Sequence, residues 1–210
     1  MKLYLISGLP ASGKTTFCKI AEEMGYPVVS MGGMSKNLYE RLYVDGFTMS
    51  EFANMMRMNL SQDYCAALTT YHIKHHEMNS DVIFVDGVRS QHEVNFFKKH
   101  FDVMVIKIKS NYIFRRNRFV IRKNRSNIIE YFDKRNDDEV RWGYSNINVD
   151  KFINNAYSLV NFKIAVKIYI EMEMNKTPSH EKDLKKLMES IDEFFESNPT
   201  FFELFKRLER

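Results

Sequence analysis

The stretch Gly8-Leu9-Pro10-Ala11-Ser12-Gly13-Lys14-Thr15 decides the fold of this chain. It matches the pattern GxxxxGK(S/T), whose glycines let backbone amide groups turn inward around phosphate oxygens. Residues 3–7 before it form a short apolar run typical of a buried strand. The apolar residues after it recur at helical spacing as far as Gly25. Because the pattern is specific where it follows a strand and opens a helix, we predict a phosphate-binding P-loop.

The residue types within this loop predict a role for several positions. We expect the loop amides and the positive N-terminal end of the new helix to hold the phosphates of ATP. Lys14 is expected to reach the outer phosphates, and Thr15 to ligate Mg²⁺ through its hydroxyl. The residues that we expect to bind ATP within the loop are Gly8, Pro10, Ala11, Ser12, Gly13, Lys14, Thr15 and Thr16.

A second candidate for the same site ends an unbroken apolar run at residues 82–85. Asp86 follows this run and is the expected Walker B acid, which would hold magnesium opposite Thr15. No glutamate comes directly after Asp86, and this absence favours transfer to a bound acceptor over hydrolysis. Arg89 suits an acceptor phosphate or carboxylate, although a surface ion pair is the alternative.

Strands and helices alternate along the chain, and this pattern predicts an α/β fold with a parallel sheet covered on both faces. Ligands in such folds bind beyond the carboxyl ends of the strands, where the P-loop and Asp86 both lie. The expected strands are residues 3–7, 27–30, 82–86, 103–108 and 157–161. Residues 36–78 are expected to be mainly helical, with a buried face formed by Met55, Met58, Tyr64, Leu68 and Tyr71.

A basic helix is predicted at residues 113–125. Its arginines recur at spacings of three, four and three, so one face carries all of them: Arg115, Arg118, Arg122 and Arg125. We interpret this face as a lid that covers the nucleotide, with Arg118 and Arg122 contacting ATP. A solvated face paired with nearby acids and a nucleic-acid patch remain open as alternatives. Arg135 and Arg141 on the next helix would add further contacts from the lid to the bound phosphates.

Composition sets a few further limits. The chain has 210 residues and a formal net charge of +4, which is too small to favour nucleic acid as a partner. Cys18 and Cys65 are the two cysteines and form no CxxC pair, so neither a disulfide framework nor a zinc site is expected. No apolar run is long enough to cross a membrane, and we expect a cytoplasmic protein without a membrane partner.

The chain is predicted to form a domain at residues 1–177 and a helical extension at 178–210. The extension contains two amphipathic stretches separated at Asn198-Pro199. Their apolar faces must be buried somewhere. Packing on the domain and contact with a second copy, which would make a homo-oligomer, are both open.

Several segments together resemble a known family. They are the P-loop, residues 27–32 and 85–90, the basic helix, Arg141-Trp142-Gly143 and residues 156–161. In this order they are similar to archaeal adenylate-kinase-related and dephospho-CoA-kinase-like P-loop nucleotide kinases. The resemblance implies a nucleoside-monophosphate-kinase-like three-layer fold with a parallel five-stranded sheet. It also implies an acceptor-binding helical region at about 31–78 and a lid at about 115–128.

The resemblance implies an ATP- and Mg²⁺-dependent phosphotransferase. Its small phosphorylated acceptor would be a nucleoside monophosphate or dephospho-CoA. The residues expected to take part in catalysis are Lys14, Asp86, Arg118 and Arg122, and those expected to bind the acceptor are Gly32, Arg89, Arg125 and Arg141. A regulatory or adaptor ATPase with slow turnover, and a kinase or ATPase acting on nucleic-acid ends, are the competing hypotheses.

Overall fold

The computed structural model describes residues 1–42, 46–75, 80–122, 127–156 and 158–174. By its contacts the chain divides into two units, Met1–Ala156 and Tyr157–Arg210, which are described separately. The boundary expected at Pro178 and the extension after it lie outside the described residues.

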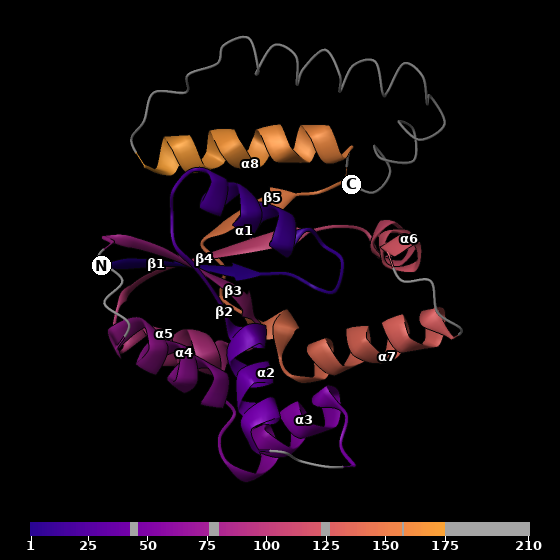
Figure 1. Cartoon of the computed structure of the whole chain (residues 1–210). Coiled ribbons are helices and arrows are strands. Elements are labelled where there is room, and N and C mark those ends of the chain that lie inside the picture. The colour runs from indigo at the N-terminus through magenta and orange to yellow at the C-terminus, as the bar shows by residue number, and fades with distance from the viewer. Residues whose placement is uncertain (43–45, 76–79, 123–126, 157, 175–210) are drawn as a thin grey trace. The chain divides into compact units, whose positions relative to one another are not determined.

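The first unit is built on a five-stranded parallel sheet with strand order β2-β3-β1-β4-β5 (Figure 1). The strands are β1 (Lys2–Ser7), β2 (Val28–Ser30), β3 (Val82–Val88), β4 (Asp102–Lys109) and β5 (Lys151–Asn154). The apolar runs of β1, β3 and β4 are buried because helices cover both faces of a parallel sheet. The predicted α/β class and five-stranded parallel sheet are therefore confirmed.

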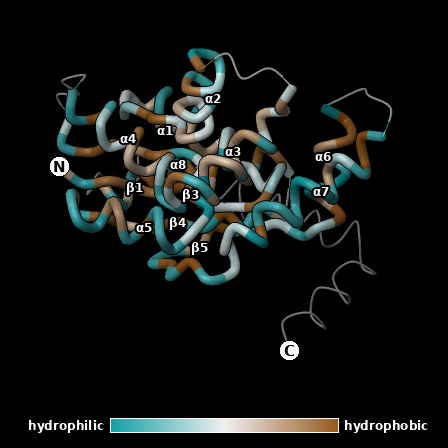
Figure 2. Tube along the Cα trace, turned by 90° about the horizontal axis from the view of Figure 1, so that it is seen from below, coloured by the Kyte–Doolittle hydropathy of each residue, from teal (hydrophilic) through white to brown (hydrophobic). Residues whose placement is uncertain are grey.

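Among the described residues of this unit, eight helical segments connect the strands or follow them. They are α1 (Lys14–Glu23), α2 (Met31–Leu42), α3 (Met49–Asn59), α4 (Tyr64–His75), α5 (Gln91–Lys98), α6 (Tyr112–Arg122), α7 (Ile128–Arg141) and the 3₁₀ turn η1 (Tyr144–Asn146). Capping boxes fix two of the starts, with Thr48 and Glu51 at α3 and Ser90 and Glu93 at α5. Along α6 and α7, hydrophilic and hydrophobic positions alternate, as expected for amphipathic helices with one solvent-exposed face (Figure 2).

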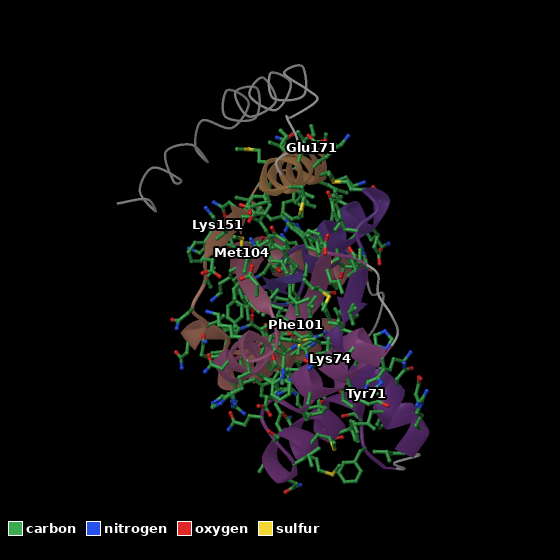
Figure 3. The ribbon with its side chains drawn as sticks, turned by 90° about the vertical axis from the view of Figure 1, so that its left-hand side faces the viewer. Tyr71, Lys74, Phe101, Met104, Lys151 and Glu171 are labelled. Carbon is green, nitrogen blue, oxygen red and sulfur yellow. The ribbon has the colours of Figure 1, made fainter. Side chains whose placement is uncertain are left out.

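The two faces of the sheet have different cores. On one face, Phe84 packs against Tyr4 and against Phe17 of α1, with ring centroids 5.1 and 5.8 Å apart. On the other face, Leu3 and Leu5 belong to a cluster with residues of α4 and α5. At the rim of that side, Lys74 of α4 lies over the Phe101 ring at 5.9 Å (Figure 3). Neither core extends over the carboxyl ends of β1 and β3, where a cavity lies.

The prediction of a strand at residues 157–161 is wrong. The fifth strand is β5, and the second unit contains helix α8 (Leu159–Glu173) instead. The Ser158 side chain accepts a hydrogen bond from the Asn161 amide, so this apolar run begins a capped helix. β5 was missed because it is an edge strand whose Lys151, Phe152 and Asn154 are exposed, which removes the apolar signal.

The buried face expected across residues 55–71 is wrong in part. Tyr64 is buried, but Met58 is 84% and Tyr71 is 64% exposed. The prediction assumed one continuous helix, whereas the chain breaks between α3 and α4, and the helical phase changes there. In the part of the chain that the structure describes, no helix combines the length and apolar character needed to cross a membrane.

Candidate functional site

A cavity of about 280 Å³ lies at the carboxyl ends of β1 and β3. P-loop residues 10–16 form one wall. Asp86, Gly87 and Arg89 approach from the end of β3, Ser30 from the end of β2, and Gly32 from the first turn of α2. Phe119 and Arg122 of α6, with Arg135 and Glu139 of α7, complete the lining. The topology therefore gathers at one place residues that are far apart in the sequence.

The P-loop wraps tightly before it opens helix α1. Gly13 has a φ of 114° and forms the N-terminal cap of α1, and Ala11 also lies in the left-handed region with a φ of 58°. A Cβ at Gly8 would lie 2.5 Å from Ser12 Oγ and 3.0 Å from the carbonyl oxygen of Ile108. Only glycine fits there, and the loop directs the amino end of α1 towards the cavity, where it favours anions.

Lys14 is held against this loop. Its ammonium group donates hydrogen bonds to the carbonyl oxygens of Gly8 and Leu9, the second at 3.2 Å. Burial lowers the pKa of Lys14, while the carboxylates of Glu139 and Asp86 act in the opposite direction. The lysine therefore lies within electrostatic reach of two acids that line the same cavity.

Asp86 and Thr15 fit the magnesium site that the P-loop implies. Both line the cavity, and Thr15 is exposed to it. Asp86 Oδ1 is buried and accepts no hydrogen bond, and burial raises the pKa of this carboxyl. A carboxylate and a hydroxyl are hard oxygen donors of the kind that Mg²⁺ prefers, so a cation there would satisfy the unpartnered oxygen.

Glu139 is a site residue that the sequence prediction missed. It is 1% exposed, and its Oε1 faces Arg89 Nε at 3.5 Å and Arg135 Nε at 3.9 Å. Its Oε2 is buried and has no hydrogen-bond donor. The prediction considered only the residues directly after Asp86 as a source of a second acid. The i,i+4 pair of Arg135 and Glu139 on the predicted helix was an available signal.

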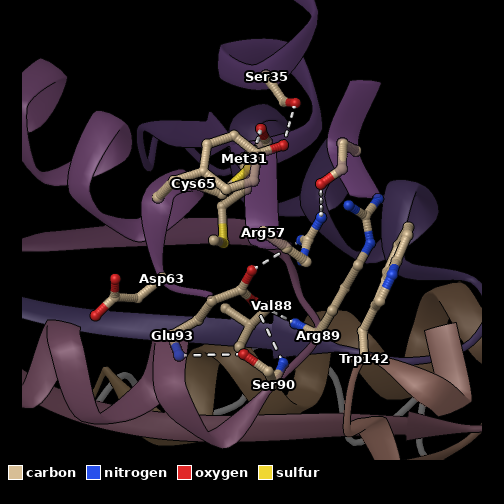
Figure 4. Close-up of polar contacts among 12 residues, drawn as sticks. Met31, Ser35, Arg57, Asp63, Cys65, Val88, Arg89, Ser90, Glu93 and Trp142 are labelled. Atoms are coloured by element: carbon tan, nitrogen blue, oxygen red, sulfur yellow. Dashed lines mark hydrogen bonds and ion pairs between the residues drawn. The ribbon is translucent and has the colours of Figure 1, made fainter. Parts of the chain in front are cut away.

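Arg89 is held in place by a stack of side chains beside the cavity (Figure 4). The Trp142 ring contacts two guanidinium groups, with its centroid 4.3 Å from Arg57 Cζ and 5.3 Å from Arg89 Cζ. The indole donates to Asn54 Oδ1 at 2.6 Å. Arg57 in turn forms a buried ion pair of 3.1 Å with Glu93. Cation–π contacts of this kind fix a planar guanidinium more firmly than a lysine.

The four arginines expected on one lid face have different surroundings. Arg115 is buried and donates to the Pro10 carbonyl at 3.2 Å and to Asn136 Oδ1 at 2.9 Å. Arg118 donates to the carbonyl oxygen and Oδ1 of Asn155, both at 3.1 Å. Arg122 lines the cavity, whereas Arg125 lies outside the described residues. The expectation that all four form one anion-facing surface is therefore wrong for Arg115, whose hydrogen bonds are to neutral oxygens of the protein.

The remaining predicted site residues divide into two groups. Gly32, Arg89 and Arg135 line the cavity, as do all the expected P-loop positions except Gly8. Gly8 instead allows the backbone to lie close to Ser12 and to the carbonyl oxygen of Ile108. Arg141 is exposed and Arg118 faces Asn155, so among the described residues these two arginines are not part of the lining.

Comparisons with known proteins show which families the chain belongs to. A family model described as "AAA domain" matches residues 5–143. A UPF0200 protein of Methanoregula boonei is 32% identical over 173 residues, which are 79% of this chain and 94% of the relative. The chain belongs to the AAA domain family and to the UPF0200 family. A UPF0200 protein of Staphylothermus marinus is 34% identical over 154 residues, which are 70% of this chain and 79% of the relative.

A solved structure supports the fold. The crystal structure of TT1252 from Thermus thermophilus matches with a TM-score of 0.54 and 15% identity, over 82% of this chain and 96% of that protein. At this identity the likeness concerns the path of the chain and not its chemistry.

Proposed function

We propose that this protein is an ATP-dependent phosphotransferase that moves the γ-phosphoryl group of ATP to a small acceptor. The observation that carries the proposal is the convergence, in one cavity, of the P-loop, Asp86 and the cationic side chains of Lys14, Arg89, Arg122 and Arg135. Phosphoryl transfer needs mainly positioning and charge stabilisation, and this lining offers both.

The roles of the residues follow from their positions in the cavity. The amides at the start of α1 would hold the phosphate chain, and Lys14 would turn from the carbonyls of Gly8 and Leu9 towards the outer phosphates. Thr15 and Asp86 would hold Mg²⁺, which when bound neutralises charge on the phosphate oxygens. Arg122 and Arg135 line the same cavity and would stabilise the charge that develops during transfer.

The acceptor would enter on the side of Gly32 and Arg89. A Cβ at Gly32 would lie 4.0 Å from Arg89 Nη2, so these two residues bound the same part of the cavity. The resemblance to adenylate-kinase-related and dephospho-CoA-kinase-like proteins supports a nucleoside monophosphate or dephospho-CoA as the acceptor.

The proposal is tested by measuring ADP release from ATP and Mg²⁺ in the presence of nucleoside monophosphates, nucleosides, dephospho-CoA or oligonucleotides. Lys14→Ala is the inactive control, because it lacks the charge on the outer phosphates. Acceleration by a small acceptor above that control supports the proposal. Slow release that no compound accelerates indicates a regulatory ATPase. Acceleration by oligonucleotides alone indicates a nucleic-acid enzyme.

A further inference from the structure

Glu139 has a carboxylate oxygen that the protein leaves without a donor. Oε1 is shared between Arg89 and Arg135, whereas Oε2 is buried and accepts no hydrogen bond. A buried, unpartnered carboxylate oxygen is costly, so a bound group that donates a hydrogen bond to it is favoured. Because Glu139 lines the cavity, a ligand in the cavity is in a position to supply that donor.

This oxygen lies close to the expected site of phosphoryl transfer. Among the charged groups that act on Lys14, Glu139 has the largest effect and Asp86 the next. Lys14 marks the outer phosphates of a nucleotide in the P-loop. Asp86 belongs to β3, the strand paired with β1, and it is placed for the metal next to Thr15. Glu139 comes from α7 and contacts Arg89, which bounds the acceptor side.

The charges around Arg89 do not suit a second phosphate. Three carboxylates act on its guanidinium, those of Glu139, Glu93 and Asp86, in this order of effect. The Arg89 guanidinium also lies over the Trp142 ring, with Cζ 5.3 Å from the ring centroid. Arg89 is thus already compensated, and a phosphate nucleophile beside Glu139 would meet like charge. A hydroxyl group carries no such charge and would donate to Oε2.

We propose that the attacking group of the acceptor is a hydroxyl, and that Glu139 takes its proton. This inference rests on the proposed function and narrows its acceptor class. The hydroxyl oxygen forms a bond to the γ-phosphorus of ATP, and its proton passes to Glu139 Oε2. The bond between the γ-phosphorus and the bridging oxygen breaks, and its electron pair leaves with ADP. A phosphate nucleophile is already ionised at neutral pH and needs no such base.

Matched acceptors test the nature of the attacking group. Each nucleoside is compared with its 5′-monophosphate, and dephospho-CoA is included because its free ribose hydroxyl is an acceptor of the hydroxyl class. ADP formation and the phosphorylated product are both measured. Phosphorylation of a hydroxyl compound, with no conversion of monophosphates to diphosphates, is the expected result. Conversion of a monophosphate to its 5′-diphosphate overturns this inference and leaves the proposed function intact. If neither class exceeds Lys14→Ala, the proposed function fails and the inference fails with it.

A variant tests the role of Glu139 as a base. Glu139→Gln keeps the volume and should lower kcat by about 10²- to 10⁴-fold with the accepting hydroxyl compound, with ATP affinity within about twofold of wild type. Asp137→Asn, which changes an exposed acid on the same helix, should leave kcat unchanged. A matched loss of thermal stability, or a raised KM at unchanged kcat, would instead indicate that Glu139 only holds Arg89 and Arg135. A raised Mg²⁺ requirement at saturating acceptor would indicate a metal ligand and would also overturn the inference.

Discussion

Arg115 of helix α6 donates a hydrogen bond to the backbone carbonyl of Pro10 in the P-loop, at 3.2 Å. The same guanidinium donates to the Ser110 carbonyl at 3.1 Å and to Asn136 Oδ1 at 2.9 Å. The first arginine of the basic helix therefore ties α6, α7 and the P-loop together. Among the described arginines of this helix, only Arg122 lines the cavity. Arg115 and Arg122 lie on one helix and are nevertheless expected to behave differently when they are replaced.

Arg115→Ala should destabilise the protein, and Arg122→Ala should impair turnover. Removing Arg115 takes a donor from one buried acceptor and two partly buried ones, which should cost about 2–3 kcal/mol of unfolding free energy. Arg122 is exposed, so its removal should change stability by no more than about 0.5 kcal/mol but lower kcat by roughly 10²-fold. Urea unfolding and ADP release measure the two effects. Equal losses of stability in both variants would contradict this division.

Asp86→Asn should make the nucleotide-free protein more stable and abolish Mg²⁺-dependent turnover. Burial raises the pKa of Asp86 above its ordinary value of 3.8. A carboxyl whose pKa is higher in the folded state binds its proton more tightly there, so its contribution to stability falls as pH rises from 3.8 through the folded-state pKa. The increase in stability of Asp86→Asn over wild type should be largest near neutral pH. It should vanish below pH 3.8, where the carboxyl is protonated in both the folded and the unfolded state. Each kcal/mol should raise Tm by roughly 2–4 °C.

Thermal unfolding at several pH values checks this prediction, with Asp102→Asn as the control because Asp102 is exposed at the start of β4. An asparagine variant that is less stable than wild type at neutral pH would show that Asp86 is stabilising in the fold. Retained turnover at low Mg²⁺ would remove it from the metal site.

Trp142→Ala should loosen Arg57 and Arg89 together. The indole contacts both guanidinium groups and donates to Asn54, so its loss should cost about 2–3 kcal/mol of stability. Trp142→Phe keeps an aromatic face but lacks the donor, and should cost about 1 kcal/mol. Chemical denaturation followed by circular dichroism compares the two. If Trp142→Phe lowers the stability as much as Trp142→Ala, the hydrogen bond to Asn54, and not the ring contacts, provides the stabilisation.

Both thiols should resist alkylation in the native protein. Cys18 and Cys65 are buried, and burial raises the pKa of each thiol. A raised pKa means that less of the reactive thiolate is present at pH 8 than for a free cysteine. Iodoacetamide should therefore modify neither thiol appreciably before unfolding, and both after addition of denaturant. Mass spectrometry counts the adducts, and rapid labelling of Cys18 in the folded state would show that the helix behind the P-loop opens readily.

The nucleotide side of the site was predictable because it is local in sequence. The P-loop is one continuous backbone segment, and its glycines, Lys14 and Thr15 act through positions fixed by a strand, a turn and a helix. Asp86 was found for the same reason, since it ends an apolar run whose place in a parallel sheet is set by topology. The lining of the cavity by both segments agrees with these predictions.

The side of the cavity near Arg89 and Glu139 could be identified only from the tertiary structure. The i,i+4 spacing of Arg135 and Glu139 predicts a pair on one helix face but does not mark Glu139 as a site residue, and only the packing of α7 brings it to Arg89 and within reach of Lys14. The stack of Arg57, Trp142 and Arg89 joins three distant segments, so no spacing in the sequence predicts it.

The sequence by itself thus determined that the chain forms a parallel α/β sheet with a phosphate loop, because backbone geometry and apolar periodicity are local. It did not determine which strand completes the edge of the sheet or which arginines face the cavity. Those depend on which side chains lie opposite one another after folding, as Arg115 and Pro10 do. Long-range packing decided both, and with them the set of side chains that line the cavity.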